Sequence, residues 1–127
     1  VQCGTRFLVA EECTVHQNYK NKILKAKDID TIATGKRLGH PVRCLKNPFT
    51  RDLFKQEYNP NISDEELEKM GAGALRKAAK EGDEKNGSFM AGQCAAMVHK
   101  EQPAKEMIEE MFAEAEQILR GASQFCK

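Results

Sequence analysis

The sequence predicts a mostly helical chain of the α/β class, and three observations lead to that prediction. Several stretches carry apolar residues at helical spacing, ending in a long stretch that starts near Pro103. Two short β-prone segments, residues 31–34 and 41–45, lie among glycine-marked turns. The opening residues 1–3 are typical of the end of a buried strand that runs into a turn at Gly4.

Composition places the chain among globular domains. Its 127 residues suffice for one domain, and 40% of them are hydrophobic, which disfavours disorder. Lys and Arg number 20 against 19 Asp and Glu, a balance that excludes the basic footprint of a simple nucleic-acid binder. No apolar run approaches the length of a bilayer span, so no membrane segment is predicted.

The cysteines argue against a metal site and for a reducing compartment. The five cysteines lie far apart, none forms a C-x-x-C pair, and the three histidines are not at metal-ligand spacing from them. Scattered unpaired thiols are typical of cytoplasmic proteins. We therefore expect a cytoplasmic protein without a metal centre.

The first helix is expected from Thr14 to about residue 27. Thr14 is a good N-cap, and Gln17 three residues later would complete a capping box. Tyr19 and Ile23 then fall on one helical face and should point inward. The lysines at positions 20, 22, 25 and 27 are expected to form a solvated face.

The middle of the chain is expected to be loop-rich and then helical. Residues 28–47 should hold one or two short extended segments, followed by a short helix over residues 51–56. Ser63 is the clearest helix start, because Glu66 can reach back to it in a capping box. That helix should run to about Met70, and a further one over residues 74–80.

Two more helices are expected at the C-terminal end. Residues 88–98 are apolar nearly all round, which predicts a buried helix starting at Ser88. The last helix should begin near Pro103, a favoured first-turn residue. We expect one apolar stripe of this helix to pack in a core: Ala104, Met107, Ile108, Met111, Phe112, Ala115, Ile118 and Leu119.

Two short motifs could contact a ligand. Residues 2–5 combine the end of a strand, a glycine and a hydroxyl residue. Gly4 would let the backbone approach a phosphate, and the Thr5 hydroxyl could donate to it. A plain strand-to-helix turn explains the same residues. Gly92 within an apolar run marks close approach of either a second backbone or a flat ligand. Arg43 could hold an anion or pair with a nearby acid. No catalytic constellation can be assigned.

Taken together, these motifs resemble a known family. The resemblance rests on residues 1–8, His16 with Tyr19-Lys20, Asp30-Thr31, residues 39–43, Asn47, residues 70–75 and residues 90–93. In this order and spacing they are similar to the C-terminal part of the FMN-dependent enoyl-acyl carrier protein reductases of type II (FabK type). These are close kin of the nitronate monooxygenases. The resemblance covers essentially the whole chain.

The resemblance implies the C-terminal part of a TIM-barrel flavoprotein. Residues 1–27 would hold the last barrel strand, the FMN-phosphate turn and the following helix. Residues 28–86 would form an inserted small substrate domain, and residues 87–127 a flavin-side helix and a C-terminal helix. The implied activity is hydride transfer from NADH or NADPH through FMN to the trans-2 double bond of an enoyl thioester in fatty acid biosynthesis.

The resemblance also implies site residues. Gln2, Cys3, Gly4 and Thr5 match the motif that binds FMN phosphate, and Met90, Gly92 and Gln93 match the motif beside the flavin and substrate cleft. The family's proposed catalytic histidine lies upstream of this segment, so this segment carries no catalytic residue. A monovalent cation activates some members, but no ligands for one can be assigned here.

The implied partners are an N-terminal portion of the same protein, an acyl carrier protein that bears the substrate, and a second copy of the chain. One barrel strand cannot close a barrel, so we expect the chain alone to be inactive. Two alternatives stay open. One is nitronate oxidation on the same scaffold, and the other is a non-catalytic helical interaction module. Neither a nucleic acid nor a membrane is expected as a partner.

Overall fold

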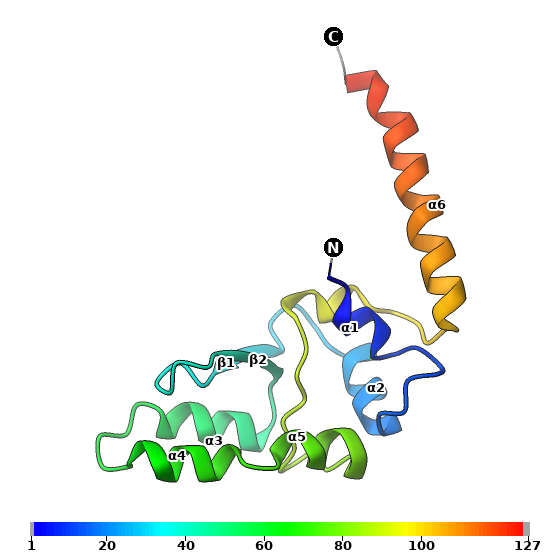
Figure 1. Cartoon of the computed structure of the whole chain (residues 1–127). Helices are drawn as coiled ribbons and strands as arrows, with labels where there is room; N and C mark the ends of the chain where they lie inside the picture. Colours follow the sequence, from blue (N-terminus) through cyan, green and yellow to red (C-terminus); the bar gives the residue numbers. More distant parts are fainter. Residues whose placement is uncertain (1, 126–127) are drawn as a thin grey trace.

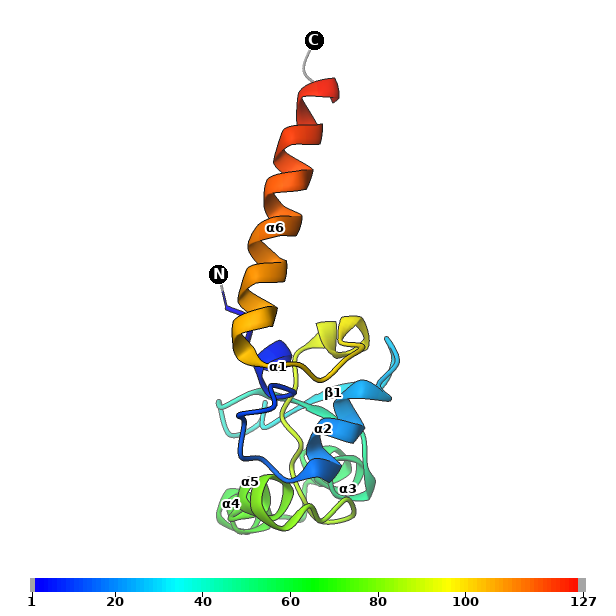
Figure 2. The ribbon, with the colours of Figure 1, turned by 90° about the vertical axis from the view of Figure 1, so that its right-hand side faces the viewer.

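The computed structural model describes residues 2–125 and shows a mostly helical chain with one small sheet (Figure 1). In chain order the elements are α1 (Gly4–Phe7), α2 (Gln17–Leu24), β1 (Thr31–Thr34), β2 (Val42–Leu45), α3 (Pro48–Gln56), α4 (Asp64–Gly71), α5 (Ala74–Arg76), the π-helical turn η1 (Lys77–Glu81), the 3-10 helix η2 (Gln93–Met97), α6 (Ala104–Ala122) and the 3-10 turn η3 (Ser123–Phe125). The elements before α6 form one body, and α6 extends away from it in both views (Figures 1 and 2).

The two extended segments expected in the middle of the chain form an antiparallel hairpin. β1 pairs with β2 in a register that places Thr31 opposite Leu45 and Thr34 opposite Val42. Gly35 follows β1 with a φ of +81°, and a Cβ there would lie 2.4 Å from the carbonyl oxygen of His40. Only glycine therefore fits this turn.

Residues 88–92 are extended, so the helix predicted over residues 88–98 is wrong for its first half. The amide of Leu45 donates to the carbonyl of Phe89 (2.8 Å), and the amide of Ala91 donates to the carbonyl of Arg43 (3.1 Å). Cys44 and Met90 pair in an antiparallel bridge. The segment thus runs beside β2, and only Gln93–Met97 is helical, as a 3-10 helix. Bonds to β2 have replaced the bonds of a local helix.

The starts of the helices confirm some capping predictions and correct another. Ser63 and Glu66 form the predicted capping box at α4. The predicted cap at Thr14 is wrong, because α2 starts at Gln17 and its N-cap is His16, whose Nδ1 accepts from the amide of Asn18 at 3.1 Å. His16 is already held in place, since its own amide donates to the carbonyl of Ala79 (2.8 Å).

The predicted opening strand does not appear among the described residues. Gln2 and Cys3 have no regular structure, and Val1 lies outside the described residues. The amides of Arg6 and Phe7 donate to the carbonyl of Cys3 (3.1 and 3.3 Å), which closes the turn of α1. A strand needs a neighbouring strand for its backbone groups, and none of the described segments pairs with residues 2–3.

The core lies where α2 meets residues 89–98. Tyr19, Ile23 and Phe89 are fully buried, and the rings of Tyr19 and Phe89 meet edge to face with centroids 4.9 Å apart. Lys20 is also buried, which corrects the prediction that it lies on a solvated face. Its ammonium donates to the carbonyl of Ala10 and to Glu101, both at 2.7 Å, so the charge is paired.

The last helix forms as predicted, but its apolar stripe does not pack in a core within this chain. Met107 is the one buried residue of α6 in the part of the chain that the structure describes. Ile108 is 45% exposed, and Phe112, Ile118 and Leu119 are 71–75% exposed. The reason is visible in Figures 1 and 2, where α6 leaves the body after its first turns.

Asn47 connects three segments and should dominate local stability. Its side-chain oxygen accepts from the amide of Thr50 (2.9 Å) as the N-cap of α3, and its Nδ2 donates to the carbonyls of Glu84 (3.0 Å) and Gly87 (2.7 Å). We expect Asn47→Ala to lower the free energy of unfolding by about 2 kcal/mol, because a helix cap, the buried carbonyl of Gly87 and the partly buried carbonyl of Glu84 lose their partner. The exposed-cap control, Ser63→Ala, should cost about 1 kcal/mol.

Urea denaturation followed by circular dichroism measures both variants. An equal loss in the two variants would contradict this role of Asn47, because it would leave only the cap and no contribution from the bonds to Glu84 and Gly87.

Candidate functional site

The two ligand motifs of the sequence are in direct contact. The backbone amide of Gly92 donates to the Oγ1 of Thr5 at 2.8 Å, across 87 positions of the chain. A Cβ at Gly92 would lie 3.3 Å from that same oxygen, so the glycine permits this close approach. The close neighbour of Gly92 is therefore the side chain of Thr5, and not the second backbone that the sequence analysis offered as one explanation.

An open hollow of about 530 Å³ lies over this contact, and we call it the Thr5–Gly92 hollow. Its walls come from α1, α2, β2, α5 and residues 90–92. The lining residues are Gly4, Thr5, Leu8, Tyr19, Val42, Arg43, Leu75, Met90, Ala91 and Gly92. Four of the seven predicted site residues are among them. Gln2 and Gln93 are exposed outside the lining, and Cys3 is half-buried outside it.

The donors at this hollow suit a phosphate. The Thr5 hydroxyl accepts from Gly92, which leaves its O–H able to donate to an anion. A Cβ at Gly4 would meet nothing within 4 Å, so a phosphate can approach the backbone there. Arg43 lines the same hollow and donates to the Oγ1 of Thr31 (2.9 Å) rather than to an acid, so its charge is available to an anion. The chemistry of these residues therefore fits the phosphate of a flavin mononucleotide.

Two buried side chains have raised pKa values in this region, Tyr19 in the lining of the hollow and Cys44 next to Arg43 on β2. The Tyr19 hydroxyl donates to the carbonyl of Met90 at 2.6 Å, and burial raises the pKa of Tyr19. The Cys44 thiol lies 3.2 Å from the Oγ of Ser88, and burial raises the pKa of Cys44 above its usual value. Burial of Cys44 therefore favours its neutral thiol over the thiolate that a nucleophile requires.

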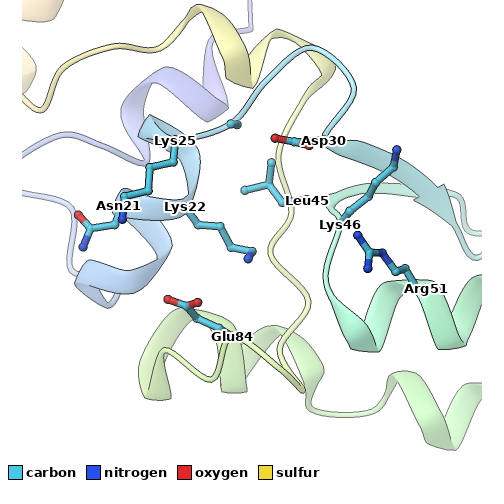
Figure 3. Close-up of a pocket in the computed structure, with 9 residues that line it drawn as sticks. Asn21, Lys22, Lys25, Asp30, Leu45, Lys46, Arg51 and Glu84 are labelled. Atoms are coloured by element: carbon cyan, nitrogen blue, oxygen red, sulfur yellow. The ribbon is translucent and has the colours of Figure 1, made fainter.

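A second hollow, of about 270 Å³, is basic and was not anticipated from the sequence (Figure 3). It lies between α2, α3 and residues 45–46, where β2 ends. Four cations and two carboxylates line it: Lys22, Lys25, Lys46, Arg51, Asp30 and Glu84. The lysine-rich stretch around α2 was the only sign of this hollow in the sequence. Lys46 and Arg51, which add two more positive charges, come from distant parts of the chain. None of the predicted site residues lies there.

Other classes of site find no support in residues 2–125. No group of three or more His, Cys, Asp or Glu side chains in this range could hold a metal ion. His40 and His99 are exposed. None of the described helices combines the length and the hydropathy that crossing a membrane requires.

Comparison with known proteins identifies the family. The family model described as nitronate monooxygenase matches residues 1–114. The chain belongs to the nitronate monooxygenase family. This is a family of flavin-dependent oxidoreductases built on a TIM barrel, as the resemblance in the sequence predicted.

Curated nitronate monooxygenase relatives are much longer than this chain. A probable nitronate monooxygenase from Staphylococcus saprophyticus is 32% identical over 120 residues, which cover 94% of this chain and 33% of that protein. A probable nitronate monooxygenase from Staphylococcus aureus is 25% identical over 121 residues, with the same two coverages. The chain thus spans about a third of the length of these relatives.

Two solved structures match nearly the whole chain. FabK from Thermotoga maritima superimposes with a TM-score of 0.81 at 44% identity, covering 92% of this chain and 38% of that one. A nitroalkane oxidase from Streptomyces ansochromogenes gives a TM-score of 0.72 at 28% identity, covering 94% and 34%. These TIM-barrel neighbours confirm the predicted fold class, of which this chain covers a portion.

The Tyr19 hydroxyl should hold Met90 at the floor of the hollow. We expect Tyr19→Phe to lower the free energy of unfolding by about 1–2 kcal/mol, because the partly buried carbonyl of Met90 loses its donor. The matched control is Tyr58→Phe, whose side chain is 66% exposed and which should change stability by less than about 0.5 kcal/mol. The urea denaturation midpoints of the two variants test this prediction. Equal midpoints would show that the hydrogen bond from Tyr19 to Met90 contributes nothing to stability.

Proposed function

We propose that the chain is the C-terminal portion of an FMN-containing, NAD(P)H-dependent enoyl-acyl carrier protein reductase, which reduces the trans-2 double bond of enoyl thioesters in fatty acid biosynthesis. The observation that carries this proposal is that the chain has a higher sequence identity to FabK than to the nitroalkane oxidase and the staphylococcal relatives reported above. The chain is 44% identical to FabK from Thermotoga maritima, against 28% to the nitroalkane oxidase and 32% to the first staphylococcal relative.

The residues at the Thr5–Gly92 hollow would bind and orient the cofactor. Gly4 and Thr5 would hold the FMN phosphate, with Gln2 and Cys3 alongside. The residues across the hollow, Met90, Gly92 and Gln93, would border the flavin edge and the acyl site. FMN, when bound, would supply the hydride chemistry. The protein would supply position and electrostatics, and the Gly92–Thr5 bond would keep the two halves of the site in register.

The proposal extends to the organisation of the whole protein. Residues 1–27 and 87–127 would belong with a barrel, and residues 28–86 would form the substrate domain. The partners would be an N-terminal barrel portion, an enoyl acyl carrier protein and a second copy, in the cytoplasm. A monovalent cation would act as an activator. The isolated chain would be inactive, because it would lack most of the flavin pocket.

Nitronate oxidation is the second candidate, and the matching family model and the staphylococcal relatives favour it. The polypeptide that joins this chain to its barrel should be assayed in two ways: NAD(P)H oxidation with a crotonyl thioester under nitrogen, and oxygen uptake with a nitroalkane. Turnover of the thioester alone is the expected result. Turnover of the nitroalkane alone would replace the reductase by the oxidase. Inactivity in both assays, without bound flavin, would support a non-catalytic module.

Substitutions at Thr5 test the cofactor site. In the same polypeptide, Thr5→Val should weaken FMN binding about tenfold, because both the phosphate donor and the acceptor for the Gly92 amide are lost. Thr5→Ser keeps the hydroxyl and should stay within about twofold of the parent. Quenching of flavin fluorescence during titration of the apoprotein measures both affinities. Equal affinities for the Val and Ser variants would remove Thr5 from the phosphate site.

A further inference from the structure

A third cavity, of about 310 Å³, lies between the hairpin and helices α3 and α4, and we call it the α3–α4 cavity. In Figure 1 the hairpin lies directly above these two helices. Most of its wall is aliphatic or aromatic, including Leu38, Phe49, Leu53, Leu67 and Leu75. Its size is at the lower end of the range of ligand pockets, about 300–1,000 Å³.

One carboxylate lies in this apolar wall. Glu57, at the C-terminal end of α3, is only 6% exposed and lines the cavity. Its Oε1 accepts a hydrogen bond from the backbone amide of Gly35. Its Oε2 is buried and has no hydrogen-bond partner in the part of the chain that the structure describes. An unpaired buried carboxylate oxygen costs free energy that a suitable ligand group would recover.

No positive charge of the lining compensates Glu57. The lining contains no Lys, Arg or His, and its second ionisable residue, Glu68, is also acidic and lies exposed at the rim. The guanidinium of the hairpin loop, Arg37, is engaged elsewhere, with Asp64 at 2.7 Å and with two backbone carbonyls of the α3–α4 connection. The Oε2 of Glu57 is therefore available to a cationic donor that enters the cavity.

The walls are already fixed in the structure. Arg37 donates to the carbonyls of Asn59 (3.1 Å) and Ile62 (2.7 Å), which ties the hairpin loop to the connection between α3 and α4. Gly35 has no room for a side chain, and its amide orients Glu57. A ligand would therefore meet a pre-organised carboxylate and lose little affinity to ordering the site.

We propose that the α3–α4 cavity binds a slender aliphatic molecule with a primary ammonium head. The ammonium donates to the Oε2 of Glu57, and the chain packs among Leu53, Leu67 and Phe49. An ammonium offers three donors and a compensating charge, whereas an alcohol offers one donor and no charge. This inference is independent of the proposed function, although Met90, Val42 and Leu75 line both this cavity and the Thr5–Gly92 hollow.

The test uses n-hexylamine, 1-hexanol and hexanoate as probes on the purified protein. We expect hexylamine to bind about tenfold more tightly than hexanol by isothermal titration calorimetry, and hexanoate not to bind. Glu57→Gln should weaken hexylamine binding about tenfold. The matched control, Glu68→Gln, removes an acid from the exposed rim and should leave the affinity within about twofold. The methyl chemical shifts of Leu67, which lines the α3–α4 cavity and not the Thr5–Gly92 hollow, should move when hexylamine binds.

A second variant keeps the proposal testable if Glu57→Gln does not fold. Ala72 is exposed at the same cavity, so Ala72→Phe should obstruct the mouth and abolish hexylamine binding while the far-ultraviolet circular dichroism stays unchanged. Three results would overturn the proposal. They are equal affinities for hexylamine and hexanol, undiminished binding in a folded Glu57→Gln variant, and absence of binding at millimolar hexylamine. In the last case the cavity would hold only water at Glu57.

Discussion

The described part of the chain depends on one extended segment, residues 88–92, whose backbone bonds to a different element at almost every residue. The amide of Ser88 donates to the carbonyl of Ala74 in α5, the carbonyls of Phe89 and Met90 accept from Leu45 and Tyr19, and the amides of Ala91 and Gly92 donate to Arg43 and Thr5. Backbone groups buried in this way must be paired. The segment therefore fixes the N-terminal turn, α2, the hairpin and α5 relative to each other.

This arrangement explains why the two apolar hollows are neighbours. Met90 lies on the extended segment and lines both the Thr5–Gly92 hollow and the α3–α4 cavity. Ser88 and Met90, two positions apart on the extended segment, line the α3–α4 cavity, whereas Ala91 and Gly92 line only the Thr5–Gly92 hollow. The small residues on the segment, Ala91 and Gly92, leave the first hollow open. The position of the candidate site thus follows from backbone pairing and not from any single functional side chain.

Sequence patterns predicted the elements that are set by neighbouring residues. They failed for the elements that are set by hydrogen bonds to distant parts of the chain. The capping box at Ser63 and the β-prone residues 31–34 carry their own structural information, and both appear as expected. The run at residues 88–98 is apolar without a clear period, and such a run is compatible with a buried strand as well as with a helix. The pairing with β2, over forty residues away, decided in favour of an extended segment. His16 displaced Thr14 as a cap for the same reason, since Ala79 holds its backbone.

The candidate site was predictable in its residue types but not in its geometry. Gly4, Thr5 and Gly92 were identified from the sequence, yet nothing local indicates that Thr5 accepts from Gly92. The carboxylate of Glu57 gave no signal at all, because its neighbours in sequence are polar and its burial comes from Gly35 and the hairpin. The same argument applies to α6, whose stripe through Ile108, Phe112 and Leu119 is apolar and exposed. Burying such side chains is worth about 1.5–3 kcal/mol each, so a packing partner on this face would stabilise α6. The relatives, about three times as long as this chain, contain additional chain that could supply one, which agrees with the proposed barrel.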